Sequence, residues 1–145
     1  MASHAAIGVP TEVLVVPDGY DGMFSAELVA GALQRGLAAS GQPALVSTLA
    51  DPAYDLQMRA ARAVVTGMGR IERRSLVGTV LSEVATRARQ AGVPCHAVVG
   101  HSALDLFDLR ILDLQLVLEA GTLAEIEAAG AELGAAILAD VALGA

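Results

Sequence analysis

Two carboxylates stand close together after the first apolar segment of the chain. Asp18 and Asp21 alternate with Gly19 and Gly22, directly after residues 12–17. Paired carboxylates can coordinate a hard divalent cation, or can differ in pKa so that one of them acts as a base. The structural alternative is that Asp18 accepts hydrogen bonds from turn amides while Asp21 is solvated. Both aspartates are candidate catalytic residues, with either interpretation open.

Three arginines form a second cluster, at Arg70, Arg73 and Arg74. They precede a segment with helical spacing, and both guanidinium groups and the free amides of a helix start favour anions. The cluster is therefore a candidate site for a carboxylate or a phosphate. Its alternative role is ion pairing with Glu72 or with the two aspartates of the first loop.

A histidine and a serine follow a later apolar segment, residues 94–99. Histidine is the only side chain whose ordinary pKa lies near neutrality, so His101 is a candidate general acid or base, with Asp18 as its orienting carboxylate. The alternative is a solvated loop histidine. Cys95 and His96 lie inside the apolar segment itself and are interpreted as structural.

The elements that must position these side chains alternate along the chain. Short apolar, β-branched segments predict five strands, at residues 12–17, 44–49, 63–66, 94–99 and 113–118. Helical spacing and capping residues predict four helices, at residues 25–41, 51–60, 75–92 and 122–141. Residues 67–70 are predicted as a glycine-rich turn. The fold class is α/β, a Rossmann-like three-layer sandwich with a mainly parallel five-stranded sheet.

In such a sheet ligands bind beyond the carboxyl ends of the strands. Any ligand is therefore expected between residues 18–24 and 67–75, near residues 100–102. Beside the three candidate catalytic residues, the candidate ligand-binding residues on these loops are Tyr20, Ser25, Gly67, Gly69, Arg70, Glu72, Ser75 and Ser102. No resident metal or cofactor is predicted.

Composition limits the classes of partner. The chain has 145 residues, of which 54% are hydrophobic and 3% aromatic, so one domain over residues 11–145 is expected after a flexible tail at residues 1–10. The net charge of −7 argues against nucleic acid and anionic membrane surfaces. A single cysteine and the lack of a long apolar segment or a signal peptide predict a cytoplasmic protein.

Two loops resemble a known family. Residues 15–26, VVPDGYDGMFSA, resemble the opening of bacterial glycerate kinases, typically APDSFKGSLSA. Residues 64–79, VVTGMGRIERRSLVGT, resemble the family's VITGEGRLDAQSLAGK, and residues 87–94 continue the likeness. The resemblance extends over most of the chain, residues 12–137. It implies phosphorylation of D-glycerate by ATP between a Rossmann-like domain and a second domain inserted into it.

The chain departs from this family at the inserted domain and at charged positions. Residues 49–51 begin like the family's ADGGEGT, but residues 52–54 replace its glycines and no inserted domain follows. By the resemblance, Asp21, Met68 and Thr79 stand where the family has Lys, Glu and Lys. An aspartate in place of a lysine repels the phosphate that phosphoryl transfer must stabilise. The resemblance therefore predicts a pseudoenzyme.

Three hypotheses of function follow. The first is a glycerate-kinase-like protein without kinase activity that binds a small anion, a carboxylate or a phosphate, or a protein partner through the former substrate crevice. The second is an enzyme of different chemistry, an isomerase, lyase or hydrolase, that uses His101 with Asp18 or Asp21. The third is a glycerate kinase subunit completed by a second chain.

A homodimer is also predicted. The mean hydropathy of +0.58, with only 17% charged residues, is high for a small domain that exposes much of its own surface. The Ala- and Gly-rich final helix is the predicted contact, because small residues let helices approach closely. The alternative is that the second copy covers the crevice.

Overall fold

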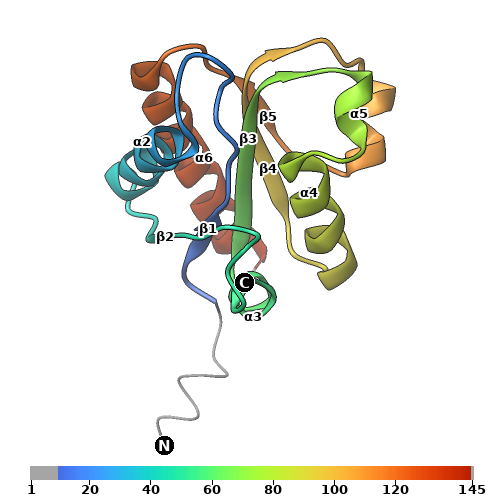
Figure 1. Cartoon of the computed structure of the whole chain (residues 1–145). Helices are drawn as coiled ribbons and strands as arrows, with labels where there is room; N and C mark the ends of the chain where they lie inside the picture. The colour runs from blue at the N-terminus through green and yellow to red at the C-terminus, as the bar shows by residue number, and fades with distance from the viewer. Residues whose placement is uncertain (1–9, 145) are drawn as a thin grey trace, which may run out of the picture.

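The computed structural model describes residues 10–144 (Figure 1). The tail was predicted over residues 1–10, of which residues 1–9 lie outside the described residues. The elements in chain order are β1 (Val13–Val15), α2 (Ala26–Ala39), β2 (Ala44–Val46), α3 (Tyr54–Arg59), β3 (Ala63–Ile71), the 3-10 turn η1 (Arg73–Leu76), α4 (Val80–Ala91), β4 (Cys95–Ser102), α5 (Leu106–Leu112), β5 (Val117–Glu119) and α6 (Leu123–Gly144).

The five strands form one sheet in the order β2-β1-β3-β4-β5, and every neighbouring pair is parallel. Helices α2 and α6 cover one face, and α4 and α5 cover the other (Figure 1). The predicted α/β, Rossmann-like three-layer sandwich is confirmed. No helix within residues 10–144 has the length and apolar character that a bilayer crossing requires.

Strand β1 lies at the centre of the molecule because both of its faces are apolar. Val13 and Val15 pack into the core beneath α2 and α6, whereas Leu14 and Val16 pack into the core beneath α3 and α4. All four side chains are at most 1% exposed. An unbroken apolar segment is the pattern expected of a parallel strand covered on both sides.

Helix capping follows the sequence signals closely. The Ser25 side chain accepts a hydrogen bond from the Leu28 amide at the start of α2. Thr122 and Glu125 exchange side-chain and backbone hydrogen bonds at the start of α6, as the predicted capping box requires. Gly92 ends α4 in the left-handed conformation. The starts of α2 and α6 and the end of α4 were therefore predictable from local chemistry.

Helices α2 and α6 pack unusually closely, through glycines. A Cβ at Gly36 would collide with the Glu127 carbonyl oxygen, and one at Gly130 would lie 2.8 Å from the Leu33 carbonyl oxygen. The glycines at this contact are thus used inside the domain. Other small residues of α6, such as Ala128 and Ala135, remain exposed, so the dimer contact that the sequence predicted at this helix stays a prediction.

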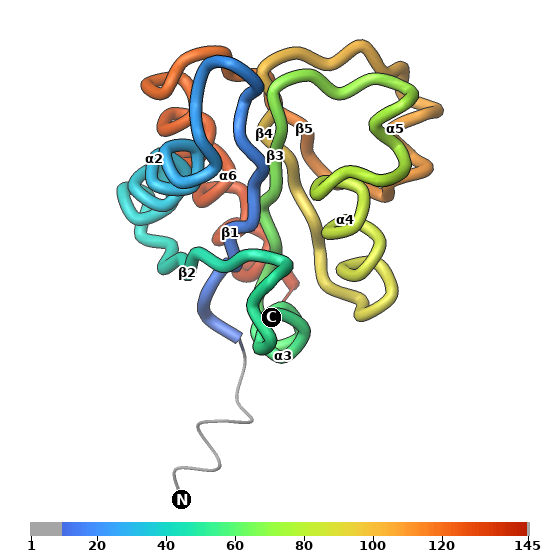
Figure 2. The backbone as a smooth tube through the Cα atoms, in the orientation of Figure 1, coloured from blue at the N-terminus to red at the C-terminus, as the bar shows by residue number. Residues whose placement is uncertain are grey.

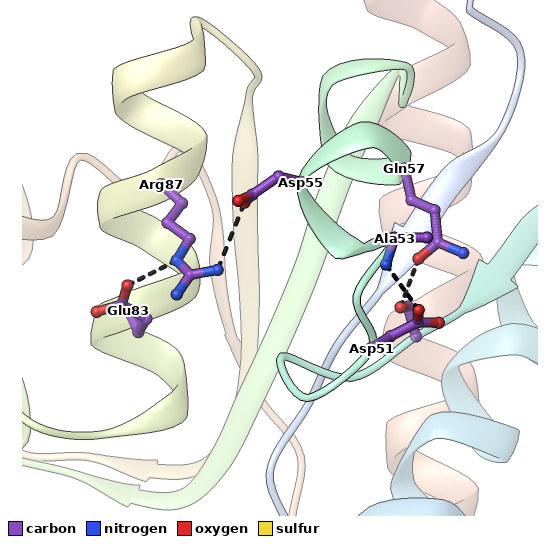
Figure 3. Close-up of polar contacts among 7 residues, drawn as sticks. Asp51, Ala53, Asp55, Gln57, Glu83 and Arg87 are labelled. Atoms are coloured by element: carbon purple, nitrogen blue, oxygen red, sulfur yellow. Dashed lines mark hydrogen bonds and ion pairs between the residues drawn. The ribbon is translucent and has the colours of Figure 1, made fainter.

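The connection between β2 and β3 contains the short helix α3, held by polar contacts (Figure 3). The Arg87 guanidinium of α4 donates to Glu83 at 2.6 Å and to Asp55 of α3 at 3.4 Å. Ser47 donates to the Gln57 side chain at 2.6 Å. The predicted helix began at Asp51, but the Asp51 carboxylate instead caps a turn by accepting from the Ala53 amide.

Several expectations about the secondary structure were wrong. The predicted helix at residues 75–92 begins only at Val80, after η1, and the predicted strand at residues 113–118 begins only at Val117. The predicted turn at residues 67–70 is part of β3, which runs on to Ile71 beside an equally extended β4 (Figure 2). Its glycines serve close contact, because a Cβ at Gly67 would collide with the Val98 carbonyl oxygen. Helix α5 was not predicted, although Asp105 caps it by accepting from the Asp108 amide.

We predict opposite effects for two alanine substitutions in α2. Gly36→Ala should lower the free energy of unfolding by about 1–3 kcal/mol, because the new methyl group overpacks the contact with α6. Gly31→Ala should raise it by about 0.5–1 kcal/mol, because its Cβ meets only the end of the Arg35 side chain and alanine favours helix. Urea denaturation measures both. Equal effects would contradict the close packing of α2 on α6.

Candidate functional site

At the carboxyl edge of the sheet the strands end at different levels and so form a step. Strand β1 ends at Val15, whereas β3 and β4 continue to Ile71 and Ser102. The chain that leaves β1 stays beside β3 only as far as Asp18, whose amide donates to the Gly67 carbonyl at 2.9 Å. A pocket of about 690 Å³ opens over this step, between the first loop and the extended strands. This is the edge at which the sequence predicted a ligand.

Tyr20 anchors the first loop beneath this pocket. Its side chain is 3% exposed and its hydroxyl donates to the Ala120 carbonyl at 3.0 Å, while burial raises the pKa of the phenol to about 12. The ring fits because two neighbours lack side chains: a Cβ at Gly69 or at Gly100 would lie 3.2 Å from Tyr20 atoms. Tyr20, a predicted ligand-binding residue, therefore holds the loop in place.

Asp18 and Asp21 both line the pocket. One Asp18 oxygen accepts from the Gly19 amide at 2.8 Å, which is the turn contact that the structural alternative expected. Neither carboxylate forms an ion pair with any of residues 10–144. Within the same residues, no cluster of three metal-ligating side chains is present. The first wall of the pocket thus carries two unpaired negative charges.

The opposite wall carries arginines that are already paired. Arg70 and Arg74 both line the pocket, and both lie near the same Glu72 carboxylate oxygen, at 3.8 and 3.0 Å. Ser75 is buried, and its hydroxyl accepts from the Glu72 amide at 3.1 Å, which fixes Glu72 at the start of η1. The arrangement matches the ion-pair alternative for the arginine cluster.

Thr79 lines the pocket but caps a helix. Its hydroxyl accepts from the Ser82 amide at 3.0 Å and donates to the Ser75 carbonyl at 2.9 Å. Three predicted ligand-binding residues do not line the pocket: Ser25, Gly67 and Ser102. Ser25 is the N-cap of α2, and Gly67 offers only a main-chain contact.

His101 lines the pocket from the end of β4, with its side chain 59% exposed. Its Nδ1 atom lies 3.4 Å from a Glu119 carboxylate oxygen, which also accepts from the Ser102 amide at 2.7 Å. The carboxylate beside His101 is therefore Glu119 and not Asp18. Sequence reasoning missed Glu119, although its place at the end of the last strand could have identified it.

Apolar lining residues were also missed. Met23 and Met68 line the pocket, as does Gly121, which follows β5. Met23 is 65% exposed at the first loop. Gly121 could have been found by applying the carboxyl-edge rule to the fifth strand, but nothing in the local sequence marks the two methionines.

Cys95 and His96 lie inside β4, as predicted, and both are nearly inaccessible. Burial raises the pKa of the Cys95 thiol to about 12. Burial lowers the pKa of His96, an effect that the Asp140 carboxylate opposes. The Nδ1 atom of His96 has no hydrogen-bond partner among the described residues. Both residues belong to the core.

Comparison with known proteins shows the family. A model of the glycerate kinase family matches residues 43–132, more than half of the chain. The chain therefore belongs to the glycerate kinase family, as the motif at residues 64–79 predicted. The match does not include residues 15–26, so the likeness of the first loop stays a prediction. No curated protein sequence matches the chain.

Three solved structures that resemble the chain are flavodoxins or related flavoproteins. A diflavin flavoprotein A3 from Nostoc sp. matches with a TM-score of 0.60 and 16% identity, over 95% of this chain and 100% of that one. A flavodoxin from the domain Archaea gives 0.55 and 13%, over 88% and 99%. A flavodoxin-like domain from Synechococcus sp. gives 0.56 and 17%, over 88% and 99%. These likenesses show the fold.

These structures contradict the function predicted from the sequence. This chain covers 99–100% of the flavodoxin-like chains, so its fold is one that those proteins build without an inserted domain, and a lost kinase half is not needed to explain the crevice. The hypothesis of a pseudoenzyme that binds an anion or a protein partner through a former substrate crevice is therefore wrong. Its two alternatives are dropped with it, since His101 also pairs with Glu119 and not with Asp18 or Asp21.

We predict that His96 makes the fold sensitive to mild acid. Its pKa is lower in the folded state than the ordinary 6.5, so the unfolded state binds more protons below about pH 6.5. Stability is then fully present above that pH and falls as the pH drops toward the folded-state pKa, by at most about 1.4 kcal/mol per pH unit.

Urea denaturation between pH 7.5 and pH 5.5 measures this effect, with His96→Gln as the variant and the exposed His101→Gln as its control. The His96 variant should lose overall stability but show a flatter pH dependence, whereas the control keeps the native slope. An unchanged slope in the His96 variant would assign the acid sensitivity to other groups.

Proposed function

We propose that the pocket binds a small organic molecule rich in hydrogen-bond donors, a polyol or an amine. The observation that carries this proposal is that the charged side chains on the two walls of the pocket differ in whether they have an ion-pair partner. Asp18 and Asp21 have no cationic partner among the described residues, whereas the arginines that line the pocket already share Glu72. A ligand therefore meets two unpaired carboxylates on one wall, and on the other wall two guanidinium groups that share a single carboxylate.

The sum of charges supports a donor-rich ligand. Three carboxylates (Asp18, Asp21 and Glu72) and two guanidinium groups (Arg70 and Arg74) line the pocket, which gives a formal charge of −1 with neutral His101. An anion bound to the arginines would have to share them with Glu72 and would lie across the pocket from the two aspartates. A carboxylate or phosphate ligand, as predicted from the sequence, is not favoured by this balance.

The other lining residues fit the same kind of ligand. Met23 and Met68 offer polarisable apolar contact to the carbon skeleton of a polyol or amine. His101, held by Glu119, offers its second ring nitrogen to a hydroxyl group. We keep Asp18, Asp21 and His101 as the residues that contact the ligand.

A flavin, which the names of the similar structures suggest, does not fit this lining. In folds with this strand order, flavin mononucleotide binds at the switch point between β1 and β3. Here Asp18, Asp21 and Glu27 surround the start of α2, where its phosphate would lie, and would repel it. Tyr20 is the only aromatic side chain in the lining, and it is buried with its hydroxyl occupied.

Two further expectations, the homodimer and the cytoplasmic location, remain proposals. We propose a homodimer, supported by the high mean hydropathy and by apolar side chains left in solvent. The cytoplasmic location rests on the single cysteine, which is buried as a thiol.

A matched series of sugars tests the proposed ligand class. Glucosamine, glucose and glucose 6-phosphate share one skeleton and differ in charge, so melting temperatures in their presence compare a cation, a neutral polyol and an anion. We expect the largest rise with glucosamine and the smallest with the phosphate. A ligand at ten times its Kd adds about 1.4 kcal/mol to the stability of the folded state.

The variants Asp18→Asn and Asp21→Asn should each reduce the glucosamine effect while keeping side-chain shape. Glu132→Gln removes the same charge from the exposed surface of α6, away from the pocket, and should leave the effect unchanged. A larger rise with glucose 6-phosphate than with glucosamine would contradict the proposal.

A further inference from the structure

Another pocket lies at the amino edge of the sheet, opposite the pocket described above. It has a volume of about 150 Å³ and lies between the starts of β3 and β4 and the second half of α6. Its polar lining residues are Arg62, His96 and Asp140, and Ile137 and Val141 are among its apolar ones. A space of this size accepts a molecule of about six non-hydrogen atoms. We call it the amino-edge pocket.

Two opposite charges line the amino-edge pocket without meeting. Arg62 and Asp140 form no ion pair with each other or with any other residue in the described part of the chain. The Asp140 side chain belongs to an exposed residue near the end of α6. A molecule in the pocket therefore meets a cation and an anion, each able to take a new partner.

Arg62 is held in place by contacts that leave most of its donors unused. Its Nε atom donates to the Pro10 carbonyl at 3.1 Å, and its Nη1 atom donates to the Gln42 side-chain oxygen at 2.9 Å. Gln42 is fully buried, so this second contact is fixed by the core. A guanidinium group has five N–H donors, so three of them have no partner among residues 10–144. Such a group can bind a carboxylate through two parallel hydrogen bonds.

His96 gives independent evidence that the pocket takes a polar molecule. Its ring lines the pocket, yet the residue is only 2% exposed and its Nδ1 atom has no hydrogen-bond partner among the described residues. A buried polar atom without a partner marks a place where a bound molecule can complete the hydrogen bonding. Because burial lowers the pKa of His96, the ring is neutral at pH 7 and offers one N–H donor and one acceptor nitrogen.

We propose that the amino-edge pocket binds a small zwitterion of the α-amino acid class. The carboxylate of the ligand pairs with the unused N–H groups of Arg62, and its ammonium group pairs with Asp140. The last turn of α6 carries no basic residue, and the carbonyl end of a helix favours a cation as well. Ile137 and Val141 then contact a short aliphatic side chain. The site is separate from the pocket proposed above for a polyol or an amine.

Three molecules of one shape test this ligand class. L-alanine, isobutyrate and isopropylamine differ only in whether a methyl group replaces the ammonium group or the carboxylate. In an NMR titration, L-alanine should shift the backbone amides of Ala63 and His96 in a saturable way. Each analogue loses one charged partner and should bind at least about tenfold more weakly. The amides of Gly69 and Gly100, at the opposite edge of the sheet, should not move.

Asp140→Asn removes the charge while keeping the side-chain shape, and the exposure of Asp140 means that the fold should be kept, which a melting curve checks. This variant should raise the Kd for L-alanine at least about tenfold without weakening isobutyrate. Glu132→Gln, on the exposed surface of the same helix, is the control and should change neither. The proposal is overturned if L-alanine gives no saturable shifts, if either analogue binds as tightly, or if Asp140→Asn leaves L-alanine binding unchanged.

Discussion

Glycines at the carboxyl edge of the sheet decide how closely its strands and its first loop approach one another. Gly67 lies against the Val98 backbone, and Gly69 and Gly100 leave the space that the Tyr20 ring occupies. Because of these contacts, β3 and β4 continue past the end of β1 while the first loop folds down beside them. The step in the sheet, and with it the pocket, depends on this close approach. A side chain at any of the three positions would separate the two walls.

The electrostatic character of the pocket follows from the same backbone. The turn into η1 places Glu72 near both Arg70 and Arg74, so one of the two positive charges on this wall is balanced within it. The first loop carries its aspartates to the opposite wall, where no cation among residues 10–144 pairs with them. This unequal pairing of charges is the basis of the proposed donor-rich ligand.

Close packing of the helices also decides which of their apolar side chains are buried and which are exposed. Gly36 and Gly130 bring α2 and α6 into backbone contact, so the buried glycines of the final helix serve the core while several of its alanines stay exposed. The larger apolar side chains of α5 remain outside. The glycerate kinase family match rests on the sequence of residues 43–132, whereas the flavodoxin-like structures show the fold of the chain.

Local signals in the sequence determined the alternation of strands and helices, the caps at Ser25 and Thr122, and the sheet edge where polar loops meet. These features depend on neighbours within a few residues, so one sequence suffices to predict them. The tertiary structure decided whether residues 67–70 turn or extend, because glycine permits both and only contact with β4 and Tyr20 selects one. It also decided that His101 meets Glu119 and that Phe107 remains exposed, since both outcomes depend on elements that are distant in sequence and are brought together only by folding.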